Sequence, residues 1–277
     1  MAVRVVTDST ADLPGDVAAE MGITVVPLNV LFGNEVFCDG VDISADQFFH
    51  TLQSSTTLPK TSQPSVGTFL EAYAGYPSSQ LLSVHVSSKL SGTVNSADLA
   101  AQQSSYGRVR VLDSRSVSVG LAIIAICAAK KAREGAGLQE VAAYTQSVAK
   151  RVHCIVMVDT LEYLQRGGRI GKASAFLGSA LNIKPILSVE DGEVHPLERV
   201  RTRAKALERM LEIVAAVPRA SEPWVIHSTT PADAEAIAGR LASHLKTQKV
   251  RIGRFGPVLG TYVGPGALGM AVLEGQQ

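Results

Sequence analysis

Short, apolar, β-branched runs alternate with helical patterns through the first half of the chain. The strand-like runs are "VRVVT" (3–7), "ITVVPLNVLF" (23–32), "QLLSVHVS" (80–87) and "RVRVLDS" (108–114). Helices are expected between them, over about 14–21 and from about Pro64 and Thr93 onward. Nearly continuous apolar strands joined by helices predict a mostly parallel sheet flanked by helices. In such sheets, ligands bind beyond the carboxyl ends of the strands.

The pattern changes in the second half of the chain. After two predicted helices, 117–134 and 138–151, comes a further buried strand, "CIVMVDT" (154–160). The segment 183–200 predicts a hairpin, because Asp191 and Gly192 suit a two-residue turn with positive φ angles. Helices and strands are then mixed, over about 202–216, 224–229 and 232–245, followed by two closing segments, 251–260 and 267–274.

These patterns predict an α/β protein of two domains with a cleft between them. We place an N-terminal domain, a mostly parallel sheet flanked by helices, at residues 1–160 and a mixed α+β C-terminal domain at residues 161–277. Residues 32–63 are rich in Gly, Ser, Thr and Pro, so an irregular excursion is expected there. With 277 residues and 46% hydrophobic content, the chain can give each domain a core.

Charge and cysteine content argue against several classes of protein. The 26 basic and 25 acidic residues are spread along the chain, which gives no broad electrostatic surface for nucleic acid or an anionic membrane. The three cysteines are far apart and outside CxxC pairs, as expected for buried thiols in a reducing cytoplasm. The longest apolar run, 117–129, is shorter than the ~20 residues that span a bilayer. We therefore expect a cytoplasmic protein without stable membrane insertion.

Three loops rich in Ser and Thr lie where predicted parallel strands end. They cover residues 7–10, 60–65 and 87–93, and they would converge on one edge of the sheet. Hydroxyl groups and backbone N–H groups at the start of a helix favour an anion, and Gly92 would allow a ligand close to the backbone. Helix capping explains each loop singly, so both interpretations stay open.

The glycine-rich segment "QRGGRIGKAS" (165–174) is not a Walker motif. Arg166 occupies the position of the first glycine, and Ala173 follows Lys172 where Ser or Thr is needed. The segment is either a hinge whose Arg169 meets an anion or a linker with solvated charges. Arg201 lies in a basic run at the start of a predicted helix, the end that disfavours cations. It belongs to a solvated face, or it faces a phosphate or a partner.

Patterns typical of catalysis or metal binding do not occur in the sequence. It has no GxSxG, no HExxH and no Cys/His spacing that suggests a metal site, so we expect no metal and no cofactor. His85 lies in an apolar strand and is predicted to be a core residue. Ser88 with His85 remains an alternative nucleophile and base, although residues three apart at a strand end rarely adopt the required geometry.

Several motifs occur together and in one order: "TDSTADLP", "KTSQPS", "SSKLSGT", "VLDS", "LEYLQRGGRIG", "NIKPIL", "VRTRAKA" and "GPGALG". In this combination the chain resembles the DegV family over essentially its whole length. The resemblance implies a protein that binds a long-chain fatty acid in a tunnel and presents its carboxylate to a separate fatty acid kinase, which forms the acyl phosphate. The chain itself would not be an enzyme. A serine hydrolase acting on a lipid ester, through Ser88 or Ser91, is the alternative.

The resemblance also implies roles for individual residues. Thr61, Ser62 and Ser91, with the backbone of Gly92, would bind the carboxylate. Arg169 and Arg201 would face the kinase or the transferred phosphate. The acyl chain would run past apolar residues that follow the glycine-rich segment, namely Phe176, Leu177, Leu181, Ile183 and Ile186.

One position departs from the family pattern. The family commonly has a histidine shortly before the "GPG" segment, near the carboxylate, where this chain has Tyr262. A tyrosine hydroxyl still donates a hydrogen bond but is neutral at pH 7. We therefore place Tyr262 in the carboxylate site, and we expect lipid binding to tolerate the change better than phosphoryl transfer does.

Overall fold

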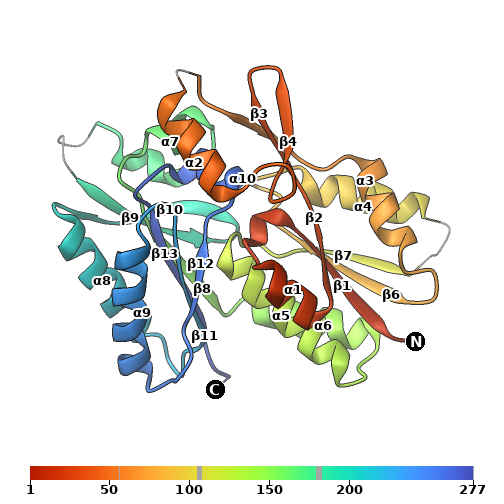
Figure 1. The fold of residues 1–277 in the computed structure, drawn as a ribbon. Coiled ribbons are helices and arrows are strands. Elements are labelled where there is room, and N and C mark those ends of the chain that lie inside the picture. The colour runs from red at the N-terminus through yellow and green to blue at the C-terminus, as the bar shows by residue number, and fades with distance from the viewer. Residues whose placement is uncertain (56, 105–107, 179–182, 277) are drawn as a thin grey trace.

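The computed structural model describes residues 1–55, 57–104, 108–178 and 183–276. In this part of the chain the strands form a four-stranded sheet in the N-terminal half, a six-stranded sheet in the C-terminal half and a small three-stranded sheet. Figure 1 shows the first two sheets side by side, with the small sheet and α2 (Ala45–Ser54) above their junction. The predicted α/β class is confirmed, because the first sheet is parallel and the second is mixed.

The N-terminal sheet has helices on both faces. Its strands, in the order β2-β1-β6-β7, are β1 (Val3–Asp8), β2 (Ile23–Val26), β6 (Gln80–His85) and β7 (Val109–Asp113). The helices of this half are α1 (Gly15–Met21), α3 (Val66–Ala74), α4 (Thr93–Gln103), α5 (Val119–Arg133) and α6 (Leu138–Ala149). Successive strand residues point to opposite faces, so Val5 packs with α5 and α6 while Val6 packs with α3 and α4.

Helix α5 lies between the two larger sheets. Residues 119–129 are buried on every side of the helix, as expected for a helix that is apolar all round. It contacts β1 on one side and β8 (Val152–Met157) on the other. The long apolar run in the sequence is therefore the centre of the molecule. Within the described residues, no helix is long and apolar enough to cross a bilayer.

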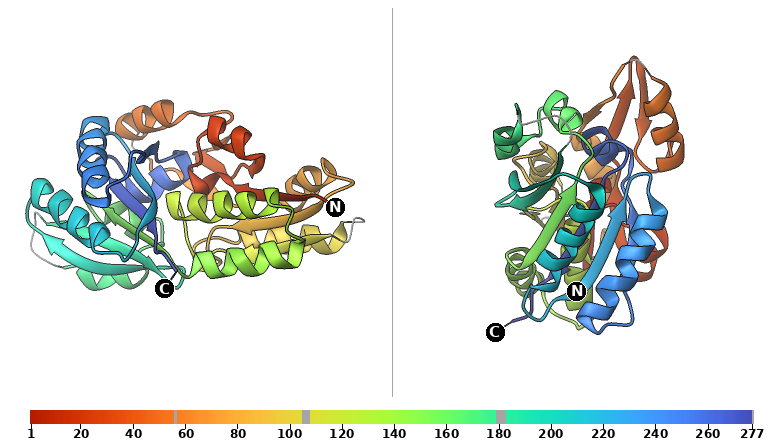
Figure 2. Two further views of the ribbon diagram at one scale, coloured as in Figure 1. Left: turned by 90° about the horizontal axis from the view of Figure 1, so that it is seen from below. Right: turned by 90° about the vertical axis from the view of Figure 1, so that its left-hand side faces the viewer.

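The C-terminal sheet is mixed and has the order β10-β9-β8-β13-β11-β12. Its other strands are β9 (Lys184–Glu190), β10 (Glu193–Val200), β11 (Ser221–His227), β12 (Arg251–Arg254) and β13 (Leu268–Leu273). Helices α8 (Arg203–Ala215) and α9 (Pro231–Leu245) cover the outer face, away from the N-terminal half (Figure 2). The predicted hairpin is confirmed, since Asp191 and Gly192 have φ angles of 49° and 80°.

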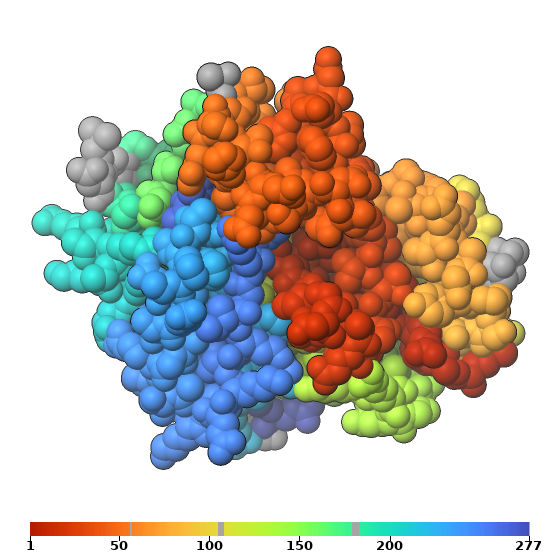
Figure 3. Space-filling model, in the orientation of Figure 1, coloured from red at the N-terminus to blue at the C-terminus, as the bar shows by residue number. Residues whose placement is uncertain are grey.

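The change from the first sheet to the second comes earlier in the chain than we expected. β8 pairs with β9 and β13, so the chain enters the second sheet before β8 and not near residue 160. A buried apolar strand suits either sheet, and only its pairing partners decide between them. On the surface, the two halves meet along a seam (Figure 3).

The described part of residues 32–63 contains short paired strands and a helix, which corrects the expected irregular excursion. β3 (Asn29–Phe32) pairs with β4 (Glu35–Cys38) and with β5 (Lys60–Ser62). Helix α2 begins at a capping box between Ser44 and Gln47, and it buries Phe48 and Phe49. Strands this short show almost no periodicity in the sequence, and their pairing and the packing of α2 stabilise them.

Candidate ligand-binding cavity

A largely apolar cavity lies between the two larger sheets, next to the carboxyl ends of β1 and β6. It encloses about 970 Å³ of space between atoms, part of which is open to solvent. Residues just after β1 and β6 line it, among them Thr10, Val86 and Ser91. This is the edge at which parallel sheets bind their ligands.

Strands β8 and β9 and helix α10 (Pro257–Val263) supply much of the apolar wall. Because successive strand residues face opposite sides, Leu187 of β9 lines the cavity while the neighbouring Ile186 packs in the core around α8. Cys154 and Val156 of β8 also line the cavity. Burial raises the pKa of the Cys154 thiol to about 12, so this cysteine is an uncharged part of the wall.

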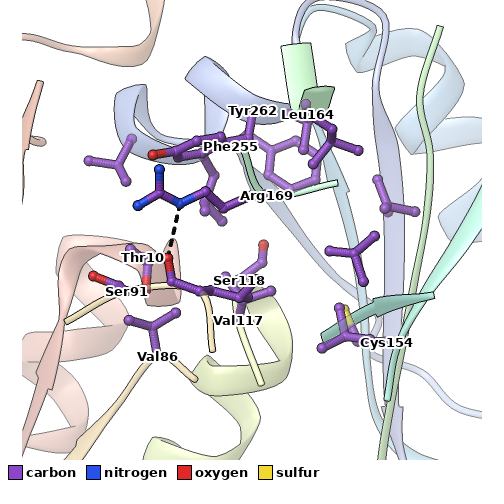
Figure 4. A pocket seen from close by; sticks show the side chains of 18 of the residues that line it. Thr10, Val86, Ser91, Val117, Ser118, Cys154, Leu164, Arg169, Phe255 and Tyr262 are labelled. Carbon is purple, nitrogen blue, oxygen red and sulfur yellow. Dashed lines mark hydrogen bonds between the residues drawn. The ribbon is translucent and has the colours of Figure 1, made fainter. Parts of the chain in front are cut away.

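One end of the cavity is polar (Figure 4). The hydroxyl oxygens of Thr61 and Tyr262 are 2.5 Å apart, although the two residues are far apart in the sequence. The Arg169 guanidinium lies over the Tyr262 ring, 5.3 Å from its centre, and Arg169 Nε donates to the carbonyl oxygen of Leu90 at 3.2 Å. Ser91 lines the same cavity. Three hydroxyl groups and a guanidinium therefore lie beside an apolar space, an arrangement that suits a single small anion.

Two glycines allow the packing that places Tyr262. A Cβ atom at Gly167 would lie 2.5 Å from the Tyr262 ring, and a Cβ atom at Gly264 would overlap the ring of Tyr163. Gly264 also has a φ of 68°, which favours glycine. The "RGG" and "GPG" segments thus bring α10 close to α7 (Glu162–Arg166) and fix the tyrosine at the polar end.

Two carboxylates of the N-terminal half hold the other end of α10. Asp12 accepts hydrogen bonds from Gly256 N at 2.8 Å and from Ser118 Oγ at 2.6 Å, and Asp39 accepts one from the backbone of Val258. Burial raises the pKa of Asp39 to about 6 and that of Asp12 well above its usual value. Helix α10 therefore connects these carboxylates to the polar end of the cavity.

His85 has both ring nitrogens engaged inside the core. Nδ1 lies 3.0 Å from Asp8 Oδ2, and Nε2 lies 2.6 Å from Ser83 Oγ. All three residues are fully buried, which confirms His85 as a core residue. Ser88 instead donates to Asp113 Oδ2 at 2.6 Å. The alternative pairing of Ser88 with His85 is therefore not formed.

Four of the predicted site residues come together at the cavity: Thr61, Ser91, Arg169 and Tyr262. Ser62 is not part of the lining. It follows Thr61 on β5 and so points to the opposite side, where Asn29 Nδ2 donates to its hydroxyl group at 3.3 Å.

Gly92 and Arg201 also lie outside the cavity lining. A Cβ atom at Gly92 would lie 2.6 Å from the side-chain nitrogen of Gln63, so a larger residue there would have to displace the end of the Gln63 side chain. Arg201 is exposed between β10 and α8. Thr202, which follows it, caps α8.

The residues predicted for the acyl-chain tunnel lie elsewhere, as far as the structure describes them. Phe176 packs against the main hydrophobic core, and Leu177 is 39% exposed. Ile183 is half-buried just before β9, and Ile186 is buried on the face of β9 that points away from the cavity. Leu181 lies outside the described residues.

Thr10, Gln63 and Ser118 add to the polar lining. Thr10 and Gln63 belong to the loops 7–10 and 60–65, so the hydroxyl clusters indicated their segments but not their roles. Ser118 gave no sequence signal. It has a φ of 56° and a ψ of −145°, a sparsely populated conformation, and its hydrogen bond to Asp12 helps to hold it there.

The fold and the cavity together define a two-sheet α/β protein with a largely apolar cavity that has one polar end. Residues 2–275 match the family described as "Uncharacterised protein, DegV family". The chain belongs to the DegV family.

Relatives of known sequence or structure match over nearly the whole chain. The DegV domain-containing protein BH3627 of Halalkalibacterium halodurans is 38% identical over 275 residues, which cover 97% of each chain. A Thermus thermophilus DegV family protein, whose structure is described as showing fatty acid binding, has a TM-score of 0.93 at 35% identity, over 99% of this chain and 100% of that one. DegV from Bacillus subtilis, described as a fatty acid binding protein, has a TM-score of 0.89 at 32% identity with the same coverage.

Proposed function

We propose that this protein binds one long-chain fatty acid, with the carboxylate at the polar end of the cavity and the acyl chain along the apolar wall. The observation that carries the proposal is the meeting of Thr61, Tyr262 and Arg169 at one end of a largely apolar space. Similarity to DegV proteins described as fatty acid binding supports the same class of ligand.

The expected energetics suit this ligand. At ~0.8 kcal/mol per buried methylene, about fourteen methylenes give roughly 11 kcal/mol before the cost of ordering the chain. The wall therefore provides most of the affinity. The hydroxyl groups of Thr61, Ser91 and Tyr262 orient the carboxylate by hydrogen bonds, without a fixed ion pair that would hold it against later transfer.

We further propose that the protein presents the carboxylate to a fatty acid kinase and is not itself an enzyme. Arg169 lies exposed at the polar end, so it can face the transferred phosphate as well as a partner. Arg201 is exposed and outside the cavity lining, so its role would concern the partner alone. The engagement of His85 with Asp8 and Ser83 argues against a hydrolase that uses this histidine as its base.

Mass spectrometry of the lipid extracted from purified protein tests the ligand class. We expect one fatty acid per chain and its exchange for added oleate. A protein that carries no fatty acid and binds neither palmitate nor oleate would overturn the proposal. Turnover of p-nitrophenyl esters that disappears in Ser88→Ala or Ser91→Ala would instead support the hydrolase.

A further inference from the structure

The cavity borders a second groove on the side away from Tyr262. Four residues line both spaces: Cys154, Ile155, Ser188 and Val189. They are consecutive residues on two paired strands, since Ile155 lies opposite Ser188 in the antiparallel β8–β9 ladder. The groove therefore begins where this part of the cavity wall ends.

The wall opposite β8 and β9 is formed by the segment before α5. It also passes from the groove to the cavity at this point. In the segment before α5, Ser114 and Ser116 line the groove, whereas Val117 and Ser118 line the cavity. Figure 4 shows Cys154 far from Arg169, across the cavity. On both walls, neighbouring residues thus pass from one space to the other.

The groove has a mixed lining of apolar and polar residues. Apolar residues line it, including Val152, Val217 and the 37% exposed Leu197. Its rim carries charges, among them Arg115 and Asp191, which are 3.6 Å apart. An acyl chain that continued from the cavity would contact the apolar part of this lining, while the exposed charges of Arg115 and Asp191 stay in solvent.

We propose that Cys154 and Val189 form a length gate opposite Val117, an inference that rests on the proposed binding of fatty acids. Acyl chains that fit within the cavity end at this gate. Longer chains pass between these side chains, and their methyl end occupies the groove. The bulk of the gate side chains then sets the longest acyl chain that the protein accepts, because each further methylene is buried only if the gate lets it through.

Two matched substitutions test the gate. Val189→Ala and Val156→Ala remove the same atoms from the cavity wall, but Val189 lines both spaces and Val156 lines only the cavity. Val189→Ala is expected to bind a chain two carbons longer than the wild-type optimum about tenfold more tightly than wild type does, because two more methylenes are buried. Val156→Ala should show no such gain, and Val189→Phe should shift the optimum to shorter chains. Displacement of a fluorescent fatty acid by the saturated series from laurate to behenate measures these affinities.

The outcomes separate the gate from the binding function itself. If the wild-type protein binds none of the acids, the proposed function fails. If it binds them and the two alanine variants share one chain-length profile, the gate is refuted while fatty acid binding stands. Folded Val189→Phe that keeps the wild-type profile refutes the gate as well.

Discussion

The two sides of the cavity are held in place by different interactions. The polar end is a set of hydrogen bonds and ring contacts between segments far apart in the sequence, centred on Thr61, Arg169 and Tyr262. The apolar wall consists of strand and helix residues such as Leu187, which is fully buried and belongs to the main core. In the proposed complex, wall residues therefore both stabilise the fold and contact the acyl chain. Residues of the polar end would orient the head group, and we expect them to contribute less to folding.

The largest effect is expected at the wall, where Leu187 and Ile186 form a matched pair. Both are fully buried, but only Leu187 lines the cavity. Leu187→Ala and Ile186→Ala should each lower the free energy of unfolding by about 2–5 kcal/mol, measured by urea denaturation of lipid-free protein. Only Leu187→Ala should change the affinity for fatty acids. An equal change in fatty acid affinity in both variants would contradict the distinction between wall and core.

A somewhat smaller effect is expected from Asp39, which holds α10 between the two sides. Its pKa in the folded protein is raised by burial from 3.8 to about 6, so the folded state keeps this proton more tightly than the unfolded state does. The stabilisation from this group is fully present below about pH 4 and is lost as the pH rises to about 6. The rise in pKa corresponds to about 3 kcal/mol in the free energy of unfolding, at about 1.4 kcal/mol per pKa unit.

Urea denaturation at several pH values between 4 and 7 measures this dependence. Asp39→Asn should reduce it and leave the part that Asp12 contributes, whereas Asp16→Asn, at an exposed position, should leave it unchanged. A wild-type pH dependence that persists in Asp39→Asn would assign it to other groups.

At the polar end we expect an effect on binding without an effect on folding. Thr61→Val combined with Ser91→Ala removes two donors and should weaken fatty acid binding by about 1–3 kcal/mol. Ser62→Ala, next to Thr61 but on the other side of β5, is the control and should bind as the wild type does. Calorimetric titration with palmitate measures both. Equal binding by the double variant and the control would remove the hydroxyl groups from the carboxylate site.

The smallest effect on lipid binding is expected at Arg201. Arg201→Ala should change fatty acid affinity by less than about 0.5 kcal/mol, since it is exposed and outside the cavity lining. Acyl phosphate formation with a fatty acid kinase should fall in the same preparation. Transfer at the wild-type rate would exclude Arg201 from the contact with the partner.

Features that depend on neighbouring residues could be predicted from the sequence. The Asp191–Gly192 turn needs two positive φ angles, and this dipeptide adopts them readily. The hydroxyl loops likewise indicated the segments that hold Thr61 and Ser91, whereas Tyr262 was placed by the resemblance to the DegV family. A local signal of this kind can be recognised from neighbouring residues without knowledge of the fold.

Features that depend on pairing between distant strands could not be predicted. The sheet to which β8 belongs is set by its ladders with β9 and β13. Whether Ile186 or Leu187 faces the cavity depends on which face of β9 the N-terminal half covers, and both residues are equally apolar. Ser62 and Thr61 differ in the same way, because one residue along a strand reverses the side chain.

The position of the carboxylate is the central claim, and carbon-13 NMR of palmitate labelled at the carboxyl carbon tests it most directly. Bound palmitate should give one carboxyl resonance whose chemical shift reports its hydrogen bonds. We expect this resonance to move in Thr61→Val and in Tyr262→Phe and to keep its wild-type position in Ser62→Ala. Palmitate that binds to Thr61→Val and Tyr262→Phe with the carboxyl resonance unmoved would contradict the placement of the head group at this end of the cavity.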